Sequence, residues 1–188
     1  SLQAWLEQHS DINQSYLLAE QVEQALDSLE SQSEDILFLQ ENRKFLAAKS
    51  YWIIGSEAWA YDLMASGIDG ILKANKNLNL LIVNTTLLDN TSGTRRKDIG
   101  LYAMNYGTAF VAGIAAYGSY SQMVRVVAEA NEFIGPSIVL AYSPMLDVTQ
   151  ESEYRNNPSL YSLTETKKAI DAGIWPLYRY NPRKQSSM

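Results

Sequence analysis

The sequence predicts an α/β protein with a doubly wound, mostly parallel β-sheet, helices on both of its faces and a helical N-terminal extension. Two observations predict this class. After residue 50, short continuous apolar runs recur, as in strands that are buried on both faces of a sheet. Helix-like patterns lie between these runs, and strands that alternate with helices form parallel sheets. The 188 residues, of which 46% are hydrophobic, suffice for one such domain with a substantial core.

The first 48 residues have the pattern of amphipathic helices. Apolar residues recur at helical spacing in two stretches, the first with Leu17, Leu18, Val22, Ala25, Leu26 and Leu29, the second with Ile36, Leu37, Leu39, Phe45 and Leu46. Between them, Ser31 to Glu34 has the Ser-x-x-Glu pattern of a capping box. We interpret residues 1–48 as a helical extension that packs on the α/β domain, and an interaction arm is the alternative.

Residues 49–182 contain the predicted sheet, and residues 183–188 form a tail. The expected strands are residues 50–55, Asn79–Thr85, Phe110–Tyr117, Ser137–Pro144 and, at an edge, Trp175–Tyr180. The expected helices are Ile68–Ala74, Asp98–Tyr106, Tyr120–Phe133 and Ser162–Ala172. In the third of these helices, Met123, Val124, Val127, Ala128 and Ala130 are expected on one side. Gly173 is placed to end the last helix as a C′ glycine.

Composition excludes several classes of function. A formal charge of −6 and a pI of about 4.8 argue against a nucleic-acid-binding surface. The sequence contains no cysteine, which excludes disulfides, thiolate zinc sites, cysteine-ligated clusters and a cysteine nucleophile. The single histidine, His9, is expected to be a surface residue, with a catalytic or metal-binding role as the alternative.

The location of the protein is also predicted. No apolar stretch is long enough to cross a bilayer and no secretory signal is evident, so we expect a cytoplasmic protein without a membrane partner. The sequence begins with Ser1 and ends in KQSSM, and we expect it to be a segment of a longer protein.

A ligand of a doubly wound sheet binds beyond the carboxyl ends of the strands. Here these ends are the polar corner Ser56-Glu57-Ala58, residues 84–93, residues 117–120 and residues 143–147. Glu57 and Asp62 are candidates for an acid/base or metal pair. The alternative is that Glu57 is a polar loop residue and that Asp62 holds backbone groups of the following turn.

Other residues near these ends also allow two interpretations. The basic run Arg95-Arg96-Lys97 either grips a phosphate or an acidic partner or forms a solvated loop. Four tyrosines either line a pocket or lie buried at a domain contact; they are Tyr102, Tyr106, Tyr117 and Tyr120. Trp52, Trp59 and Trp175 are expected to be core and anchor residues.

Several short motifs carry a resemblance to a known family. WIIGSEAWAYD, NTTLLDNTSG, KDIGLYAMNYG, GPSIVLAYSP and WPLYRYNP occur in one order over about residues 45–182. Together they resemble the thiamine-diphosphate-binding domain of pyruvate:ferredoxin oxidoreductases. More narrowly, IGSEAWAYDL, RRKDIGLYAMNY, GPSIVLAY and GIWPLYRYNP are similar to a segment of the fungal-type sulfite reductase hemoprotein, or beta, subunits.

This resemblance implies a thiamine-diphosphate-binding fold and a position for the cofactor. Thiamine diphosphate would lie against Ser56, Glu57, Ala58, Asn90 and Thr91. If the site is active, Mg²⁺ would be held by Glu57, Thr85 and the carbonyl group of Leu87.

The same resemblance shows four departures from the family. The Gly-Asp-Gly corner is replaced by Ser56-Glu57-Ala58, whose longer carboxylate misplaces a rigid octahedral ion and whose Ala58 adds a Cβ atom. The cofactor-side loop after Gly93 is largely missing. Met145 stands where the family has a cluster-ligating cysteine. The glutamate that activates thiamine comes from another domain. We therefore interpret the site as vestigial, with no catalytic residue.

Three hypotheses remain open. The first is a non-catalytic structural and assembly domain of an assimilatory NADPH-dependent sulfite reductase. By resemblance the whole enzyme contains sirohaem, a [4Fe-4S] cluster and flavin, to which this chain contributes no ligands, and the partner is the flavoprotein (alpha) subunit or a second copy. The second is an active thiamine-diphosphate- and Mg²⁺-dependent domain of a 2-oxoacid:ferredoxin oxidoreductase. The third is a small-molecule sensor that reuses the vacated pocket.

Overall fold

The structure is a computed structural model that describes residues 2–9, 11–29, 33–86, 96–145 and 157–185. The chain divides into two compact units, residues 1–50 and residues 51–188. The division falls within two residues of the predicted start of the sheet domain. Each unit has its own apolar core.

The first unit is helical, as the sequence predicts. It contains α1 (Leu2–Gln8), α2 (Ile12–Asp27), α3 (Glu34–Glu41) and the 3₁₀ turn η1 (Arg43–Phe45). Its core consists of Ala19, Val22, Leu26 and Leu46. The Ser33 hydroxyl caps α3 by accepting a hydrogen bond from the Ile36 N–H, whereas the predicted capping residue Ser31 lies outside the described residues. The packing of this unit on the α/β domain stays a prediction.

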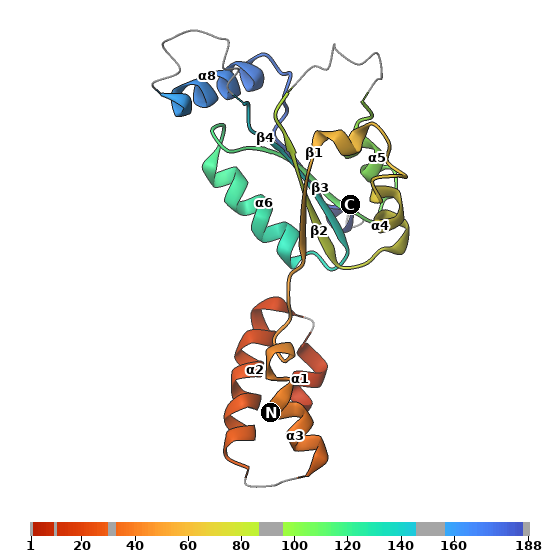
Figure 1. Ribbon diagram of the computed structural model, residues 1–188, viewed down its shortest axis with the longest axis vertical. Coiled ribbons are helices and arrows are strands. Elements are labelled where there is room, and N and C mark those ends of the chain that lie inside the picture. Colours follow the sequence, from red (N-terminus) through yellow and green to blue (C-terminus); the bar gives the residue numbers. More distant parts are fainter. Residues whose placement is uncertain (1, 10, 30–32, 87–95, 146–156, 186–188) are drawn as a thin grey trace. The chain divides into compact units, whose positions relative to one another are not determined.

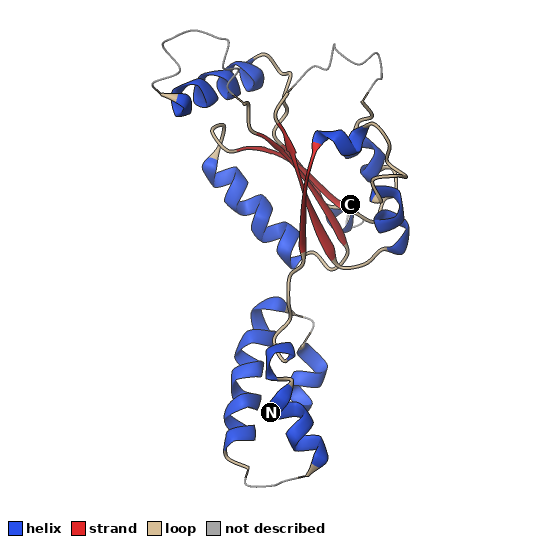
Figure 2. Ribbon diagram, in the orientation of Figure 1, coloured by secondary structure: helices blue, strands red, loops and turns tan. Residues whose placement is uncertain are grey.

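The second unit is built on one sheet, shown in Figures 1 and 2. Its described strands are β1 (Trp52–Ser56), β2 (Leu78–Asn84), β3 (Phe110–Ala115), β4 (Pro136–Tyr142) and β5 (Tyr178–Tyr180), in the order β1-β2-β4-β3-β5. The first four strands are parallel, and β5 pairs antiparallel with β3 at the edge. The mostly parallel sheet and the edge position of the last strand are therefore confirmed.

Helices cover both faces of this sheet, as predicted for a doubly wound fold. Helices α4 (Ile68–Ala74) and α5 (Ile99–Met104) lie on one face, and α6 (Tyr120–Glu132) lies on the other (Figure 1). Helix α8 (Pro158–Asp171) lies near the carboxyl ends of the strands. The short helices η2 (Glu57–Ala60) and α9 (Pro182–Gln185) complete the unit, so the predicted tail begins as a helical turn.

Each face has its own apolar core. The α4/α5 side buries residues that include Leu63, Ile68, Leu72, Leu80, Ile82, Ile99, Val111 and Ile138. The α6 side buries Phe110, Ala112, Ile114, Val126, Ala130, Phe133 and Val139. The alternating side chains of β3 contribute to both cores, and every residue of this strand is buried. This interior strand therefore joins the cores on the two faces of the sheet.

The prediction that the first strand is buried on both faces is wrong. Ile53 and Ile54 are 41% and 66% exposed. In the described sheet β1 is an edge strand that pairs only with β2. An apolar run indicates a strand, but it does not distinguish an edge position from a central one.

The predicted apolar side of the 120–133 helix is also wrong in part. Met123, Val126 and Ala130 face the sheet, whereas Val124 and Val127 are 48% and 41% exposed. Ala128, also predicted on this side, is exposed. The predicted set spans two neighbouring stripes of the helix, and only one of these can face the sheet. Among the described residues, no helix combines the length and the apolar character needed to cross a membrane.

Candidate functional site

The polar corner after β1 lies beside the end of β2. Because β1 and β2 are parallel and Ser56 pairs with Val83, both strands end at the same edge of the sheet. The chain turns into η2 directly after Ser56, whose hydroxyl accepts a hydrogen bond from the Ala58 N–H. This turn directs the Glu57 side chain toward residues 85 and 86, which follow β2.

The Glu57 carboxylate binds the end of β2 through one oxygen. Oε1 accepts hydrogen bonds from Thr85 N–H at 3.2 Å and from Thr85 Oγ1 at 2.7 Å. A third donor, Thr86 Oγ1, lies at 3.4 Å. Burial raises the pKa of Glu57, but the hydrogen bonds from Thr85 and Thr86 outweigh this effect and leave the pKa below its usual value. Glu57 is therefore an ionised acceptor that joins β1 to β2.

These contacts test the fit of a metal ion and of thiamine diphosphate to the corner. The predicted metal residues Glu57 and Thr85 do lie together. Oε1 is, however, already surrounded by three donors, so an ion reaches this carboxylate only through Oε2 or by displacing Thr85 and Thr86. Ser56 and Ala58 are exposed, and Ser56 is turned back onto its own loop. The described part of the corner does not fit a preformed Mg²⁺–diphosphate cradle.

Leu87, Asn90, Thr91 and Arg95 lie outside the described residues. The predicted roles of the first three at the cofactor and metal therefore stay predictions. Within the described ranges, no three carboxylate or imidazole side chains come together as a metal-binding group. His9 directly follows α1 and is exposed, as predicted, and the centre of its ring lies 5.1 Å from that of Trp5.

Asp62 has the structural role given as an alternative for it. Its Oδ1 accepts hydrogen bonds from the N–H groups of Met64 and Ala65, each at 3.0 Å. These bonds lower the pKa of Asp62, with a smaller contribution from the charge of Lys97. Asp62 thus stabilises the turn that leads into α4 and does not pair with Glu57.

Two of the four singled-out tyrosines form a polar cluster between α4 and α5. Asp69 is almost fully buried, and its Oδ1 accepts hydrogen bonds from Tyr102 at 2.6 Å and from Tyr106. Lys73 Nζ lies 2.7 Å from Asp69 Oδ2. Lys73 and the two tyrosines hold the pKa of Asp69 well below its usual range, and the same contacts raise the pKa of Tyr102. Tyr117 and Tyr120 are exposed.

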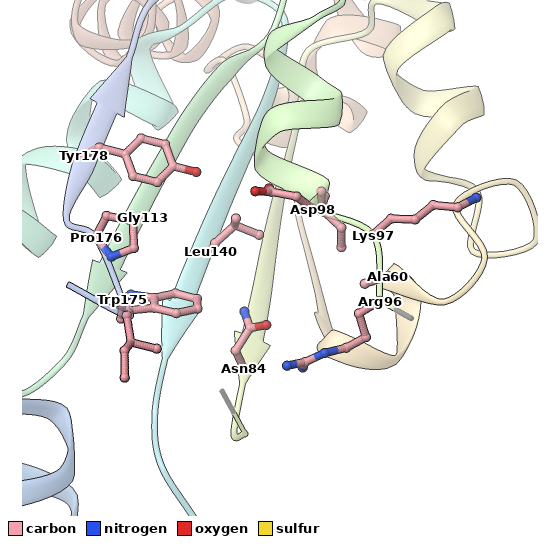
Figure 3. A pocket seen from close by; sticks show the side chains of 12 residues that line it. Ala60, Asn84, Arg96, Lys97, Asp98, Gly113, Leu140, Trp175, Pro176 and Tyr178 are labelled. Atoms are coloured by element: carbon pink, nitrogen blue, oxygen red, sulfur yellow. The ribbon is translucent and has the colours of Figure 1, made fainter. Parts of the chain in front are cut away.

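A cavity of about 290 Å³ opens next to the corner (Figure 3). Its floor includes Asn84 of β2, Gly113 of β3 and Leu140 of β4. Its walls come from residues 96–99 at the start of α5 and residues 174–178 before and within β5, with Ala60 of η2. None of Ser56, Glu57, Ala58 and Thr85 lines it. The cavity thus lies beside the described part of the predicted cofactor position, whereas Asn90 and Thr91 lie outside the described residues.

The structure brings residues into this cavity that the sequence reasoning did not assign to a site. Asp98 was expected only as the first residue of a helix, and it is the N-cap residue of α5. Trp175 was expected to be an anchor: its Nε1–H donates to the Ile114 carbonyl at 2.9 Å and its ring lies 5.3 Å from that of Tyr142. Tyr178 reaches the cavity because β5 returns antiparallel beside β3. No pattern in the sequence predicted that β5 runs antiparallel to β3.

Comparison with known proteins places these observations in a family. No family model matches the chain. The chain is 48% identical over 136 residues to the sulfite reductase [NADPH] subunit beta of Saccharomyces cerevisiae and 46% identical over 154 residues to that of Schizosaccharomyces pombe. These alignments cover 71% and 80% of this chain but only 9% and 10% of those proteins.

Relatives with lower sequence identity are named for another activity. The chain is 34% identical over 206 residues to the pyruvate:ferredoxin oxidoreductase of Moorella thermoacetica, covering 96% of this chain and 17% of that protein. The sheet and these matches define the chain as an α/β domain related to the pyruvate:ferredoxin oxidoreductases. More narrowly, it is homologous to a segment of the fungal sulfite reductase beta subunit, and it spans about a tenth of the length of those relatives.

Proposed function

We propose that this chain is a non-catalytic structural and assembly domain of an assimilatory, cytoplasmic NADPH-dependent sulfite reductase, an enzyme that reduces sulfite to sulfide. The relatives named sulfite reductase subunit beta support the link to that enzyme. The chain contains no cysteine, so it supplies no thiolate to a [4Fe-4S] cluster. In this proposal the sirohaem, cluster and flavin of the whole enzyme are bound elsewhere.

The observation that carries the proposal is the use of Glu57. Its Oε1 is held by three donors from Thr85 and Thr86, which makes the carboxylate a link between the ends of β1 and β2. A metal-binding carboxylate instead directs its lone pairs at the ion. In this arrangement the Glu57 carboxylate stays ionised and stabilises the ends of β1 and β2. In the absence of a cofactor role, contact with another protein chain is the role that we propose for this edge of the sheet.

Calorimetric titration with thiamine diphosphate and Mg²⁺ tests the loss of the cofactor. We expect no binding to the chain at ligand concentrations of about 1 mM. The matched control replaces the corner by the family's residues, as Ser56→Gly, Glu57→Asp and Ala58→Gly together. Binding by this variant alone identifies the corner as the lost element. Metal-dependent binding to the unaltered chain at micromolar ligand would overturn the proposal.

A second experiment tests the assembly role in the full-length protein. We expect replacement of Glu57, Arg95 and Arg96 by Ala to weaken association with the flavoprotein (alpha) subunit, or with a second copy, in analytical ultracentrifugation. Replacement of Lys76 and Glu132 by Ala is the control, because both are exposed and precede the amino ends of β2 and β4, at the opposite edge from the corner. Unchanged association of the first variant would exclude this edge as the contact.

One observation favours a second candidate function, an active thiamine-diphosphate-dependent domain of a 2-oxoacid:ferredoxin oxidoreductase. Glu57 Oε1 and Thr85 Oγ1, both implied as metal contacts by the family resemblance, are 2.7 Å apart. Relatives named as pyruvate oxidoreductases are consistent with that function. The same titration distinguishes the two proposals, because only the active domain binds the cofactor in a metal-dependent way at micromolar concentration.

A further inference from the structure

The cavity beside the corner has opposite charges at its two ends. Figure 3 shows Arg96 and Asn84 at one end and Asp98 and Tyr178 at the other, with Leu140 and the Trp175 ring between them. The Lys97 ammonium group points away from the cavity in the same view. One end thus presents a guanidinium and an amide, the other a carboxylate and a phenol, and the wall between them is apolar. Small-molecule sites have this composition, with few polar groups on an apolar lining.

The polar groups at both ends are held in place by hydrogen bonds within the domain. Arg96 Nη2 donates to the Thr86 carbonyl at 3.1 Å, and Asn84 Nδ2 donates to the Ile82 carbonyl at 3.2 Å. Asp98 Oδ1 accepts from the Leu101 N–H at 2.9 Å. Preorganised groups lose little conformational entropy when a ligand binds.

The apolar wall and the phenol are equally constrained. The Trp175 indole is fixed by its hydrogen bond to Ile114 and by its contact with the Tyr142 ring. Burial, with the nearby charge of Asp98, raises the pKa of Tyr178 to about 12. The phenol is therefore neutral at physiological pH and retains its proton as a hydrogen-bond donor.

We propose that this cavity binds a small α-amino acid with an apolar side chain. The ligand carboxylate lies at the Arg96 and Asn84 end, and its ammonium group lies at the Asp98 and Tyr178 end. The side chain packs against Leu140 and Trp175. An inorganic anion is disfavoured because it would face the Asp98 carboxylate, and an uncharged apolar ligand would bury both charged ends without a partner. This inference does not depend on the proposed role in assembly.

The test follows the indole N–H signal of Trp175 in ¹H–¹⁵N NMR spectra during titration with L-leucine. A Trp175→Phe variant assigns that signal among the four tryptophans of the chain. We expect a saturable shift at millimolar L-leucine. N-acetyl-L-leucine, which lacks the ammonium group, and L-leucinamide, which lacks the carboxylate, should bind at least about tenfold more weakly, because each loses a charge-assisted hydrogen bond.

Variants of the neighbouring residues Asp98 and Lys97 distinguish an effect on ligand binding from an effect on folding. Asp98→Ser removes the charge and keeps a hydroxyl that caps α5, so we expect unchanged thermal stability and about tenfold weaker L-leucine binding. Lys97→Gln is the matched control and should alter binding less than about twofold. No saturable shift up to about 20 mM, or equal affinity for all three compounds, would overturn the proposal. Unchanged L-leucine binding by Asp98→Ser would overturn it as well.

Discussion

The hydrogen bond between Thr85 and Glu57 provides a quantitative test of the corner. Thr85→Val keeps the shape of the side chain and removes the hydroxyl donor at 2.7 Å from Glu57 Oε1. A hydrogen bond to a charged group contributes about 1.5–3 kcal/mol. Since Glu57 is only half-buried, solvent screening reduces this value, and we expect a loss of about 1 kcal/mol in the free energy of unfolding at pH 7.

The loss should depend on pH in a defined direction. The folded-state pKa of Glu57 is lower than its ordinary value of 4.5, so its stabilising contribution is present above pH 4.5 and disappears as the pH falls through the folded-state pKa. The difference between Thr85→Val and the unaltered chain should therefore shrink in acid. Urea denaturation at a series of pH values measures it.

Thr86→Val is the control for this experiment. Its hydroxyl lies 3.4 Å from the same oxygen and its side chain is exposed, so we expect a change below about 0.3 kcal/mol. Combining Thr85→Val with Glu57→Gln in a double-mutant cycle should give a coupling energy of about 1 kcal/mol. Equal effects of Thr85→Val and Thr86→Val, or an effect of Thr85→Val that is the same at every pH, would refute this account of the corner.

Three further predictions concern the rest of the sheet domain. Gly113→Ala places a Cβ atom 2.7 Å from the Pro176 carbonyl oxygen, so β5 must move, and we expect a loss of about 2 kcal/mol or more in chemical denaturation. Gly173→Ala meets no atom within 4 Å but must keep a φ of +70°, so its expected cost of about 1 kcal/mol comes from backbone strain alone. Tyr178 has its pKa raised to about 12, so its contribution to stability is present below pH 10 and is lost as the pH rises toward 12. Tyr178→Phe should reduce this alkaline loss, and an unchanged alkaline profile would contradict the burial of the phenol.

Much of the domain could be predicted because its signals are local. Continuous apolar runs gave the strands, and the αL glycine at position 173 ends α8 as expected, with a φ of +70°. Asp62 was assigned a structural alternative from its place in a turn, and both backbone donors of that turn bind it. These features depend on residues that are close together in the sequence, so a local sequence pattern is sufficient to predict them.

The errors concern contacts between distant segments. The exposure of Ile53 and Ile54 follows from the position of β1 at an edge of the described sheet. The choice of the buried stripe on α6 depends on how that helix crosses the sheet, because Val124 and Val126 are equally apolar in the sequence. Neither property can be read from apolar content or periodicity.

From the sequence alone we could predict a mostly parallel α/β domain, a helical segment before it, and a polar corner with Glu57 directly after the first strand. The three-dimensional structure was needed to find that Thr85 and Thr86 donate to one oxygen of Glu57, and that Arg96 and Asp98 lie at opposite ends of one cavity. This difference arises from the sequence separation of the interacting residues. Strand and helix patterns arise from interactions among near neighbours, whereas the site depends on strand order and on the antiparallel return of β5, which bring together residues as far apart as Asn84 and Tyr178.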